Sequence, residues 1–453
     1  MRKIWFGIAG TSLVLCGCLS GCYNKKSEVE NDSSVGATVD TTLENTSLNT
    51  EQKTTTTENI INNTMYDSYT IDYTSGIKQC TISDEIDTSF VENINIIETD
   101  VQELEFKDID APENRGLSIY DFIGEEWIGT VYLKKGGVAI GTYNFNTDEY
   151  TESDEISFNF GYGHNWFRID EENFIMQTSV TIDSDVNGSD LEGIVYKYNH
   201  ESGDITAVDT YNNHNYVQAV TAVGNDAIAY YYYEADTQDW VVKYCNIENG
   251  TPKEIFRHTN ANENTTLSPQ TIVSNGTDIA LVIQYAVDGR GHTVLQWITQ
   301  EGELLESEEI PLGEIFGKRK YEIFSAYILG DYYCFTAERC KLPNTAVFRR
   351  EGDTFYPVSM GGYLLGRNDR CYLDGSIMTQ LAYETFDPDR KEKLCGAAKV
   401  DFINKSLTVC EIPEIDKEER VGNQMCYITP DNKFLTFYSD LNENYKYFVV
   451  DGR

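Results

Sequence analysis

The stretch Gly224-Asn225-Asp226-Ala227-Ile228-Ala229-Tyr230 begins with turn-forming residues and continues as an apolar run, and Asn249-Gly250 marks a second turn further along. Short apolar runs bounded by Gly, Asn and Asp are typical of β-strands joined by tight turns. Asn-Gly in particular favours a hairpin, because a type I′ turn requires positive φ at both central residues. Residues 224–250 therefore predict two hairpin turns with a strand on either side of each.

Both turns recur along the chain with a common period of about 50 residues, which indicates a repeat architecture. The first turn precedes an apolar run each time and recurs as Gly124-Glu125-Glu126, Glu171-Glu172-Asn173, Asn275-Gly276-Thr277-Asp278, Gly330-Asp331, Asp374-Gly375 and Pro430-Asp431-Asn432. The second recurs as Asn146-Thr147-Asp148, Ser202-Gly203, Glu301-Gly302, Glu351-Gly352, Asn404-Lys405 and Asp451-Gly452. Two turns of equal period imply four strands in each repeating unit.

Four antiparallel strands that repeat every 40 to 50 residues, roughly, are the signature of a β-propeller. The sequence therefore predicts an all-β fold of seven four-stranded blades. The seventh unit ends at Asp451-Gly452-Arg453 without its fourth strand, whereas Glu103-Leu104-Glu105-Phe106-Lys107 alternates polar and apolar residues and has no unit of its own. We expect this N-terminal strand to close the ring, because closure removes exposed sheet edges. The alternative is eight blades, the additional one being built from residues 66–100; a solenoid or a sandwich fits the pattern less well.

One unit resembles a known family. Residues Ile428-Thr429-Pro430-Asp431-Asn432-Lys433-Phe434 resemble the Ser-Pro-Asp-Gly-Lys repeat of TolB-like propellers, with Thr in place of Ser and Asn in place of Gly. The resemblance covers one unit of seven, so it implies the propeller fold and transfers no active site. The Trp-Asp and Gly-Gly signatures of WD40 and kelch propellers do not recur from unit to unit in the sequence.

The N-terminus carries the pattern of an export signal. Arg2 and Lys3 precede an apolar segment, residues 4–19, that is too short to span a membrane. Leu19-Ser20-Gly21-Cys22 then resembles the lipobox of bacterial lipoproteins, in which the cysteine thiol receives a diacylglycerol and becomes the new N-terminus. The resemblance implies a signal peptide over residues 1–21, lipid attachment at Cys22 and a location on the extracytoplasmic face of the cell membrane. The alternative is an ordinary secretory signal with an incidental cysteine.

Composition divides the rest of the chain into two parts. Residues 22–65 are rich in Ser, Thr, Asn and Glu and cannot bury a core, so we expect a disordered tether followed by a propeller domain over residues 66–453. The whole chain has 74 acidic against 35 basic residues and a net charge of −39. This charge argues against a nucleic-acid partner, since phosphate backbones bind basic patches. The eight cysteines after Cys22 permit disulfides in an exported protein or serve equally as small buried residues.

Two further motifs have a chemical and a structural interpretation each. In Asp183-Ser184-Asp185-Val186-Asn187-Gly188-Ser189-Asp190, oxygen ligands at alternate positions and a glycine resemble the first half of a calcium loop, with Asp183, Asp185, Asn187 and Asp190 as candidate Ca²⁺ ligands. A solvated acidic hairpin loop is the alternative, because Asp and Asn are common in turns.

Tyr230-Tyr231-Tyr232-Tyr233 could form a carbohydrate platform, but we expect alternate rings to pack between blades instead.

The predicted fold brings distant residues to one mouth, because the first strand of every blade lines the central channel. This places a mixed polar and aromatic set at the channel, and convergent polar groups in a concave site are the default hypothesis for ligand binding. Three arginines in the set indicate an anionic or sugar-like ligand. The alternative is that these side chains only fill the channel. The candidate ligand-binding residues are Arg115, His164, Trp166, His214, Tyr216, Gln270, Arg367, Asp369 and Arg370.

Sequence motifs for the common hydrolases are missing. No nucleophile elbow, zinc-binding helix or phosphate-cradling glycine loop occurs. We therefore expect a lipid-anchored cell-surface propeller that acts as a ligand-binding or protein-scaffolding module, with a surface protein or glycan as its partner. The alternative is a carbohydrate-active enzyme, a glycosidase or lyase, that uses carboxylates at the mouth. Carboxylates that face one another there would favour the enzyme, and a broad apolar patch would favour protein binding.

Overall fold

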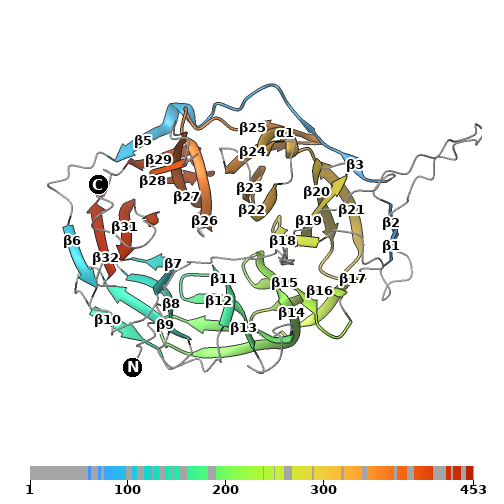
Figure 1. Cartoon of the computed structure of the whole chain (residues 1–453), viewed down its shortest axis with the longest axis horizontal. Coiled ribbons are helices and arrows are strands. Elements are labelled where there is room, and N and C mark those ends of the chain that lie inside the picture. The colour runs from blue at the N-terminus through green and yellow to red at the C-terminus, as the bar shows by residue number, and fades with distance from the viewer. Residues whose placement is uncertain are drawn as a thin grey trace, which may run out of the picture.

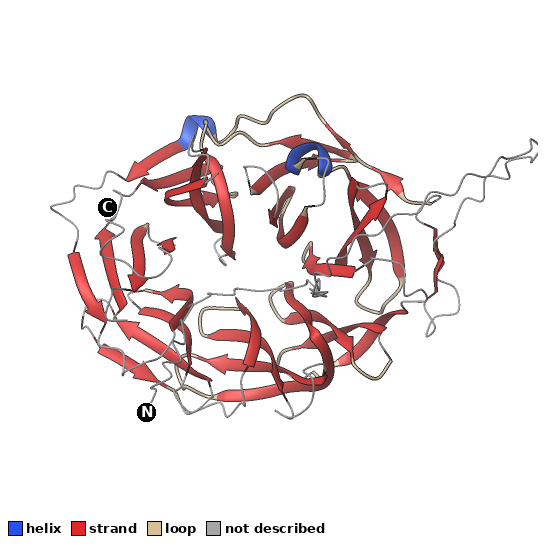
Figure 2. Cartoon of the chain, in the orientation of Figure 1, coloured by secondary structure: helices blue, strands red, loops and turns tan. Residues whose placement is uncertain are grey.

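The computed structural model describes residues 60–62, 70–72, 76–97, 105–109, 117–124, 126–132, 138–144, 147, 149–153, 161–181, 190–237, 239–248, 250–259, 268–287, 290–317, 321–338, 344–371, 375–384, 392–411, 425–429, 432–439 and 445–451. Strands dominate these residues, and the helices are the 3-10 turn η1 (Val91–Asn93) and α1 (Gly313–Phe316). The sheets stand around a common centre, so the fold is all-β and propeller-like (Figures 1 and 2).

Each sheet repeats one order, in which consecutive strands pair antiparallel from the centre outward. We call each set of four such strands a blade and name it by its innermost strand. The β7 blade consists of β7 (Leu117–Ile123), β8 (Glu126–Tyr132), β9 (Val138–Asn144) and β10 (Glu149–Glu152). The β18 blade consists of β18 (Ser268–Ser274), β19 (Ile279–Val287), β20 (Arg290–Ile298) and β21 (Leu304–Ile310). The β22 blade consists of β22 (Glu322–Leu329), β23 (Tyr332–Glu338), β24 (Thr345–Glu351) and β25 (Thr354–Pro357). The β26 blade consists of β26 (Leu364–Cys371), β27 (Ser376–Glu384), β28 (Glu392–Asp401) and β29 (Ser406–Glu411).

A single long strand joins two further blades. The strands β11 (Gly161–Arg168), β12 (Asn173–Thr181), β13 (Asp190–Asn199), β14 (Ile205–Val223), β15 (Ala227–Glu234), β16 (Asp239–Asn246) and β17 (Lys253–Thr259) form one seven-stranded sheet. The first part of β14 pairs with β13, and its second part pairs with β15 after a register shift between Asn213 and Gln218. β14 is therefore the outer strand of the β11 blade and the inner strand of the β14 blade.

The last sheet contains both ends of the fold. β30 (Met425–Ile428), β31 (Lys433–Ser439) and β32 (Tyr445–Asp451) form its first three strands. The fourth is β6 (Glu105–Ile109), which pairs antiparallel with β32, Phe106 lying opposite Phe448. The N-terminal strand thus lies where the sequence predicted it, beside the strand that lacks a C-terminal partner (Figure 1).

The segment before β6 lies on the outside of three blades, which the sequence did not predict. β3 (Lys78–Gln79), β4 (Thr81–Ile82) and β5 (Ile94–Ile97) pair in parallel with β21, β25 and β29, the outermost strands of the β18, β22 and β26 blades. We call residues 76–97 the strap. The remaining N-terminal strands, β1 (Ile60–Asn62) and β2 (Thr70–Asp72), pair only with each other in the described residues. The described strands within residues 66–100 are thus divided among several sheets and do not form an eighth blade.

The turns between strands have the backbone conformation that the repeats require. Positive φ occurs at Gly124, Gly224, Gly276, Gly330 and Gly375 in the first turn series and at Gly203, Gly302 and Gly352 in the second. At Gly302 a side chain would also collide with the Ile255 carbonyl oxygen. Asn432, which replaces Gly in the TolB-like repeat, has φ of 67°, a conformation that Asn tolerates better than most residues. The hydroxyl of Thr429 accepts a hydrogen bond from the Lys433 N–H at 2.8 Å, so Thr closes this turn.

The hydrophobic core lies between neighbouring blades. Tyr230, Tyr231 and Tyr232 are all buried, so both faces of β15 pack against neighbouring blades and not only the alternate rings that the sequence predicted. Tyr230 and Tyr232 pack with Tyr211 between the β11 and β14 blades, whereas Tyr231 packs on the other side, toward the β18 blade. The cysteines Cys80, Cys245, Cys334, Cys371 and Cys410 are free thiols.

Candidate functional site

The predicted mouth residues lie on innermost strands where they are described. Gln270 is buried on β18, and Trp166 is half-buried on β11, its ring centroid 5.2 Å from that of Phe174. Trp166 therefore contributes to packing within its blade. The other mouth residues are described by their strands alone, and their side chains lie outside the described part of the structure: His164 on β11, His214 and Tyr216 on β14, and Arg367, Asp369 and Arg370 on β26. Arg115 lies outside the described residues.

The predicted calcium loop also lies mostly outside the described residues. Asp183, Asp185 and Asn187 fall in residues 182–189, and Asp190 is the first residue of β13. Among the residues that are described, no three His, Cys, Asp or Glu side chains are grouped as metal ligands would be. Within the same residues, no helix is long and apolar enough to cross a membrane.

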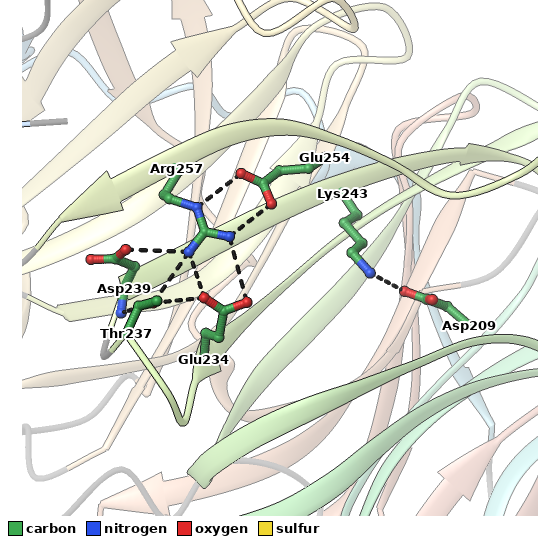
Figure 3. Close-up of polar contacts among 7 residues, drawn as sticks. All are labelled: Asp209, Glu234, Thr237, Asp239, Lys243, Glu254 and Arg257. Carbon is green, nitrogen blue, oxygen red and sulfur yellow. Dashed lines mark hydrogen bonds and ion pairs between the residues drawn. The ribbon is translucent and has the colours of Figure 1, made fainter. Parts of the chain in front are cut away.

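A charged cluster lies at the ends of β15 and β16 and on β17, the outer strand of the β14 blade (Figure 3). Arg257 donates from Nη1 to Glu234 at 2.6 Å and to Asp239 at 3.2 Å, and from Nη2 and Nε to Glu254 at 2.8 and 2.9 Å. Burial alone would raise the pKa of Glu234, but hydrogen bonds from Arg257 and Thr237 outweigh it and lower that pKa. Every nitrogen of the guanidinium is engaged, so the cluster fastens the β15–β16 turn to the outer strand.

A second ion pair lies between the β11 and β14 blades (Figure 3). Lys243 donates to Asp209 at 2.7 Å, and the Tyr230 hydroxyl donates to the same carboxylate at 2.5 Å. The Lys243 ammonium also lies 5.5 Å from the centroid of the Tyr232 ring. Burial and the hydrogen bond to Asp209 raise the pKa of Tyr230, so this hydroxyl remains protonated. The group stabilises the contact between two blades, and sequence patterns gave no signal for it because its members are far apart in the chain.

A third charged group lies beneath the strap. Glu308 is fully buried and accepts hydrogen bonds from Nη1 and Nη2 of Arg350, at 2.7 and 2.6 Å, and from Trp297 Nε1 at 2.6 Å. Cys80 of the strap approaches the same carboxylate at 3.6 Å, and burial together with Glu308 raises the pKa of its thiol to about 12. Arg350 thus ties the β22 blade to the β18 blade.

The outer surface of the strap contains a groove of about 470 Å³. Its walls are strap residues on one side and blade residues on the other. Nε of Arg349 donates to Asp87 at 2.7 Å across the groove, and the guanidinium lies 4.9 Å from the centroid of the Tyr356 ring. The ion pair holds the strap against the β22 blade. The lining residues are Glu85, Ile86, Asp87, Thr88, Ser89, Arg349, Tyr356 and Lys405.

One of the groove residues, Ile86, belongs to a small set of exposed aliphatic side chains. In the described residues the large exposed apolar side chains are Ile86, Val91, Ile96, Ile403 and, on β21, Leu305. The first three belong to the strap, and Ile403 lies in the β28–β29 turn, which the strap contacts through a hydrogen bond from Asn93 to the Lys405 carbonyl. Four of the five exposed aliphatic side chains therefore lie on the strap or on the turn beside it.

Comparison with known proteins found only distant similarities, all of them to solved structures. No family model matches, and a search of curated proteins found no match. The acylaminoacyl peptidase of Pyrococcus horikoshii has a TM-score of 0.41 and 11% identity over 71% of this chain and 50% of its own, so this chain spans about half the length of that peptidase. The β-propeller domain of the Trilobed protease from Pyrococcus furiosus, described as having an open velcro topology, has a TM-score of 0.38 and 11% identity over 65% of this chain and 90% of its own. An oligogalacturonate lyase in complex with manganese has a TM-score of 0.41 and 9% identity over 77% and 96%. These similarities assign no reaction or substrate to this chain.

Proposed function

We propose that this protein is a lipid-anchored, cell-surface β-propeller of seven four-stranded blades that acts as a binding or scaffolding module. The anchor is supported by the lipobox pattern that ends at Cys22 and by the polar composition of residues 22–65. The blade number is supported by the division of the long sheet at β14 and by the pairing of β6 with β32.

The binding role is supported by the aliphatic side chains on the strap and on the adjoining β28–β29 turn. Ile86 is 60% exposed and Ile403 is 72% exposed. In contrast, the charged side chains of the Arg257 and Glu308 clusters are engaged with one another. Exposed aliphatic side chains that gather in one place mark sites of protein interaction.

The anchor is tested by fractionation of cells that express the protein with Cys22→Ala. We expect the variant to leave the membrane fraction or to accumulate with its signal peptide uncleaved. Cys22→Ser, which preserves side-chain size but also lacks the thiol, should behave in the same way. Unchanged processing and membrane retention in both variants would exclude a lipid anchor at this residue.

The binding role is tested by photo-crosslinking on living cells. A photoreactive amino acid at position 86 or 403 should yield a discrete crosslinked product, and the same amino acid at position 305, an exposed aliphatic site on the β18 blade, should not. Equal products at all three positions, or none at any of them, would contradict a binding surface on the strap. Turnover of polysaccharides by the purified protein would instead favour the carbohydrate-active alternative.

A further inference from the structure

The exposed surface of the strap combines aliphatic and acidic side chains. We define the strap rim as Asp84, Glu85, Ile86, Val91, Glu92, Ile96 and Ile403. All of these side chains are exposed, Ile96 to 52%. Because aliphatic side chains in water gain free energy when they are covered, a partner that contacts the strap rim would need apolar side chains of its own.

Three members of the strap rim, Ile86, Val91 and Ile403, come from segments that lie close to one another in the fold. Ile86 and Lys405 line the same groove, and Ile403 lies in the turn that carries Lys405. The η1 turn, which contains Val91, packs against β29 next to that turn. One partner segment can therefore contact both the strap and the β28–β29 turn.

The carboxylates of the strap rim are not used by the fold. Asp87 accepts hydrogen bonds from Arg349 and from the Ser89 N–H, and burial would raise the pKa of Asp87 if these bonds did not lower it. Asp84, Glu85 and Glu92 carry no ion pair with any described side chain. Three unpaired negative charges thus border the aliphatic side chains in a protein of net charge −39.

We propose that the strap rim binds a partner segment that carries both aliphatic and basic side chains. The proposal depends on the binding role proposed above and names the chemistry of the partner. Lys or Arg side chains of the segment would meet Asp84, Glu85 and Glu92, and its aliphatic side chains would cover Ile86 and Ile403. The negative charge of the whole protein would speed association with such a segment, and the attraction would weaken as salt increases.

A second copy of this chain does not have this chemistry. In a two-fold symmetric contact the same surface meets itself, so the carboxylates of one strap rim would face those of the other. Like charges in that arrangement oppose association. The partner is therefore a different protein, with basic side chains at the contact.

The test measures binding of labelled peptides to the purified propeller by fluorescence anisotropy. The first probe is an amphipathic peptide of Lys and Leu; the two control probes replace Lys by Glu or Leu by Ser. We expect binding of the Lys/Leu peptide alone, with a roughly two- to fivefold loss of affinity for Glu85→Gln or Glu92→Gln, since exposed charge pairs contribute little each. Ile86→Ser should weaken binding by about tenfold, as expected for losing part of an aliphatic contact. Leu305→Ser and Glu303→Gln, an aliphatic and an acidic change outside the strap rim, should leave binding unchanged.

Three results would overturn the proposal. The first is that the Glu/Leu peptide binds as tightly as the Lys/Leu peptide, and the second is that Ile86→Ser and Glu85→Gln both leave binding of the Lys/Leu peptide unchanged. The third is that light scattering shows a dimer of the protein that Ile86→Ser dissociates. Near-ultraviolet circular dichroism of each variant shows whether the fold is intact. Crosslinks at position 86 in cells without peptide binding would reject this partner chemistry and leave the binding role standing. Peptide binding without crosslinks in cells would reject the binding role itself.

Discussion

At the scale of single residues, two adjacent arginines on β24 make different contacts. Arg350 reaches Glu308 in the next blade, with 16% of its side chain exposed, and Arg349 reaches Asp87 in the strap, with 27% exposed. The two side chains point to opposite faces of the blade, because successive residues of a strand alternate. One arginine therefore holds two blades together and the other holds the strap.

Removing Arg350 should cost far more stability than removing Arg349. Arg350→Met leaves the buried carboxylate of Glu308 with only the partly exposed Lys78 ammonium, 3.9 Å away, as a cation, and breaking a buried ion pair costs roughly 3–5 kcal/mol. Arg349→Met removes a partly exposed pair, for which about 1 kcal/mol or less is expected. Urea denaturation of both variants measures the difference in unfolding free energy. Equal values for the two would show that the Glu308 carboxylate does not depend on Arg350 for its charge partner.

Attachment of the strap should depend on pH through Asp87. Its pKa is lowered in the folded protein, so the carboxylate stabilises the docked strap at pH values above its unfolded pKa of about 4 and loses this contribution as the pH falls below it. Hydrogen exchange of residues 78–97 should therefore accelerate as the pH is lowered through this region, after correction for the intrinsic rate. Asp87→Asn should exchange faster at neutral pH and lack the acid-dependent component; a wild-type response in this variant would assign the effect to another group.

At the scale of elements, the strap is held by one aromatic side chain as well as by its short strands. Phe90 is fully buried, and its ring lies 5.7 Å from that of Tyr332 and 5.8 Å from that of Phe402, in edge-to-face geometry. This side chain connects the strap to the β22 and β26 blades. Because β3, β4 and β5 contain two to four residues each, such packing contributes much of the attachment.

Phe90→Ala should detach the strap while the blades stay folded. Truncation of a buried Phe costs about 3–5 kcal/mol, which exceeds what strands of this length can offset. We expect rapid proteolytic cleavage within residues 78–97 and near-native circular dichroism. The neighbouring Val91→Ala is the control, because that side chain is 39% exposed. Equal protection in both variants would show that hydrogen bonding alone holds the strap.

The difference between blades and strap explains what the sequence could predict. Gly224 and Asn432 occupy turn positions that require positive φ, which few other residues adopt. The strands on either side of such turns could therefore be predicted from the sequence. The strap lacks such a signal: its strands are too short for periodicity, and their partners lie more than two hundred residues away, as for Gln79 and Glu309. The Arg257 cluster was missed for a related reason, since its carboxylates meet only after three strands have paired.

At the scale of the whole molecule, we expect the arrangement to depend on the contact between β6 and β32. These strands pair from Tyr445 with Ile109 to Val449 with Glu105. Deleting residues 105–109 would leave one edge of β32 unpaired, and an unpaired edge strand promotes aggregation. We expect a lower melting temperature and growth of aggregates in light scattering. Deleting residues 60–72, which contain the separate β1–β2 pair, is the control, and a β6 deletion that melts like this control would exclude a closing role.

The order of the strap and β6 along the chain has a mechanical consequence. A force applied at the N-terminal residues reaches β3, β4 and β5 before it reaches β6, because residues 78–97 precede residues 105–109. The strap spreads that load over three blades, through hydrogen bonds, the Arg349–Asp87 pair and the side chain of Phe90. The junction of β6 with β32 carries no tension until the strap has been peeled away. In a protein pulled by its N-terminal end, we therefore expect the strap to detach before the β6–β32 pair is loaded.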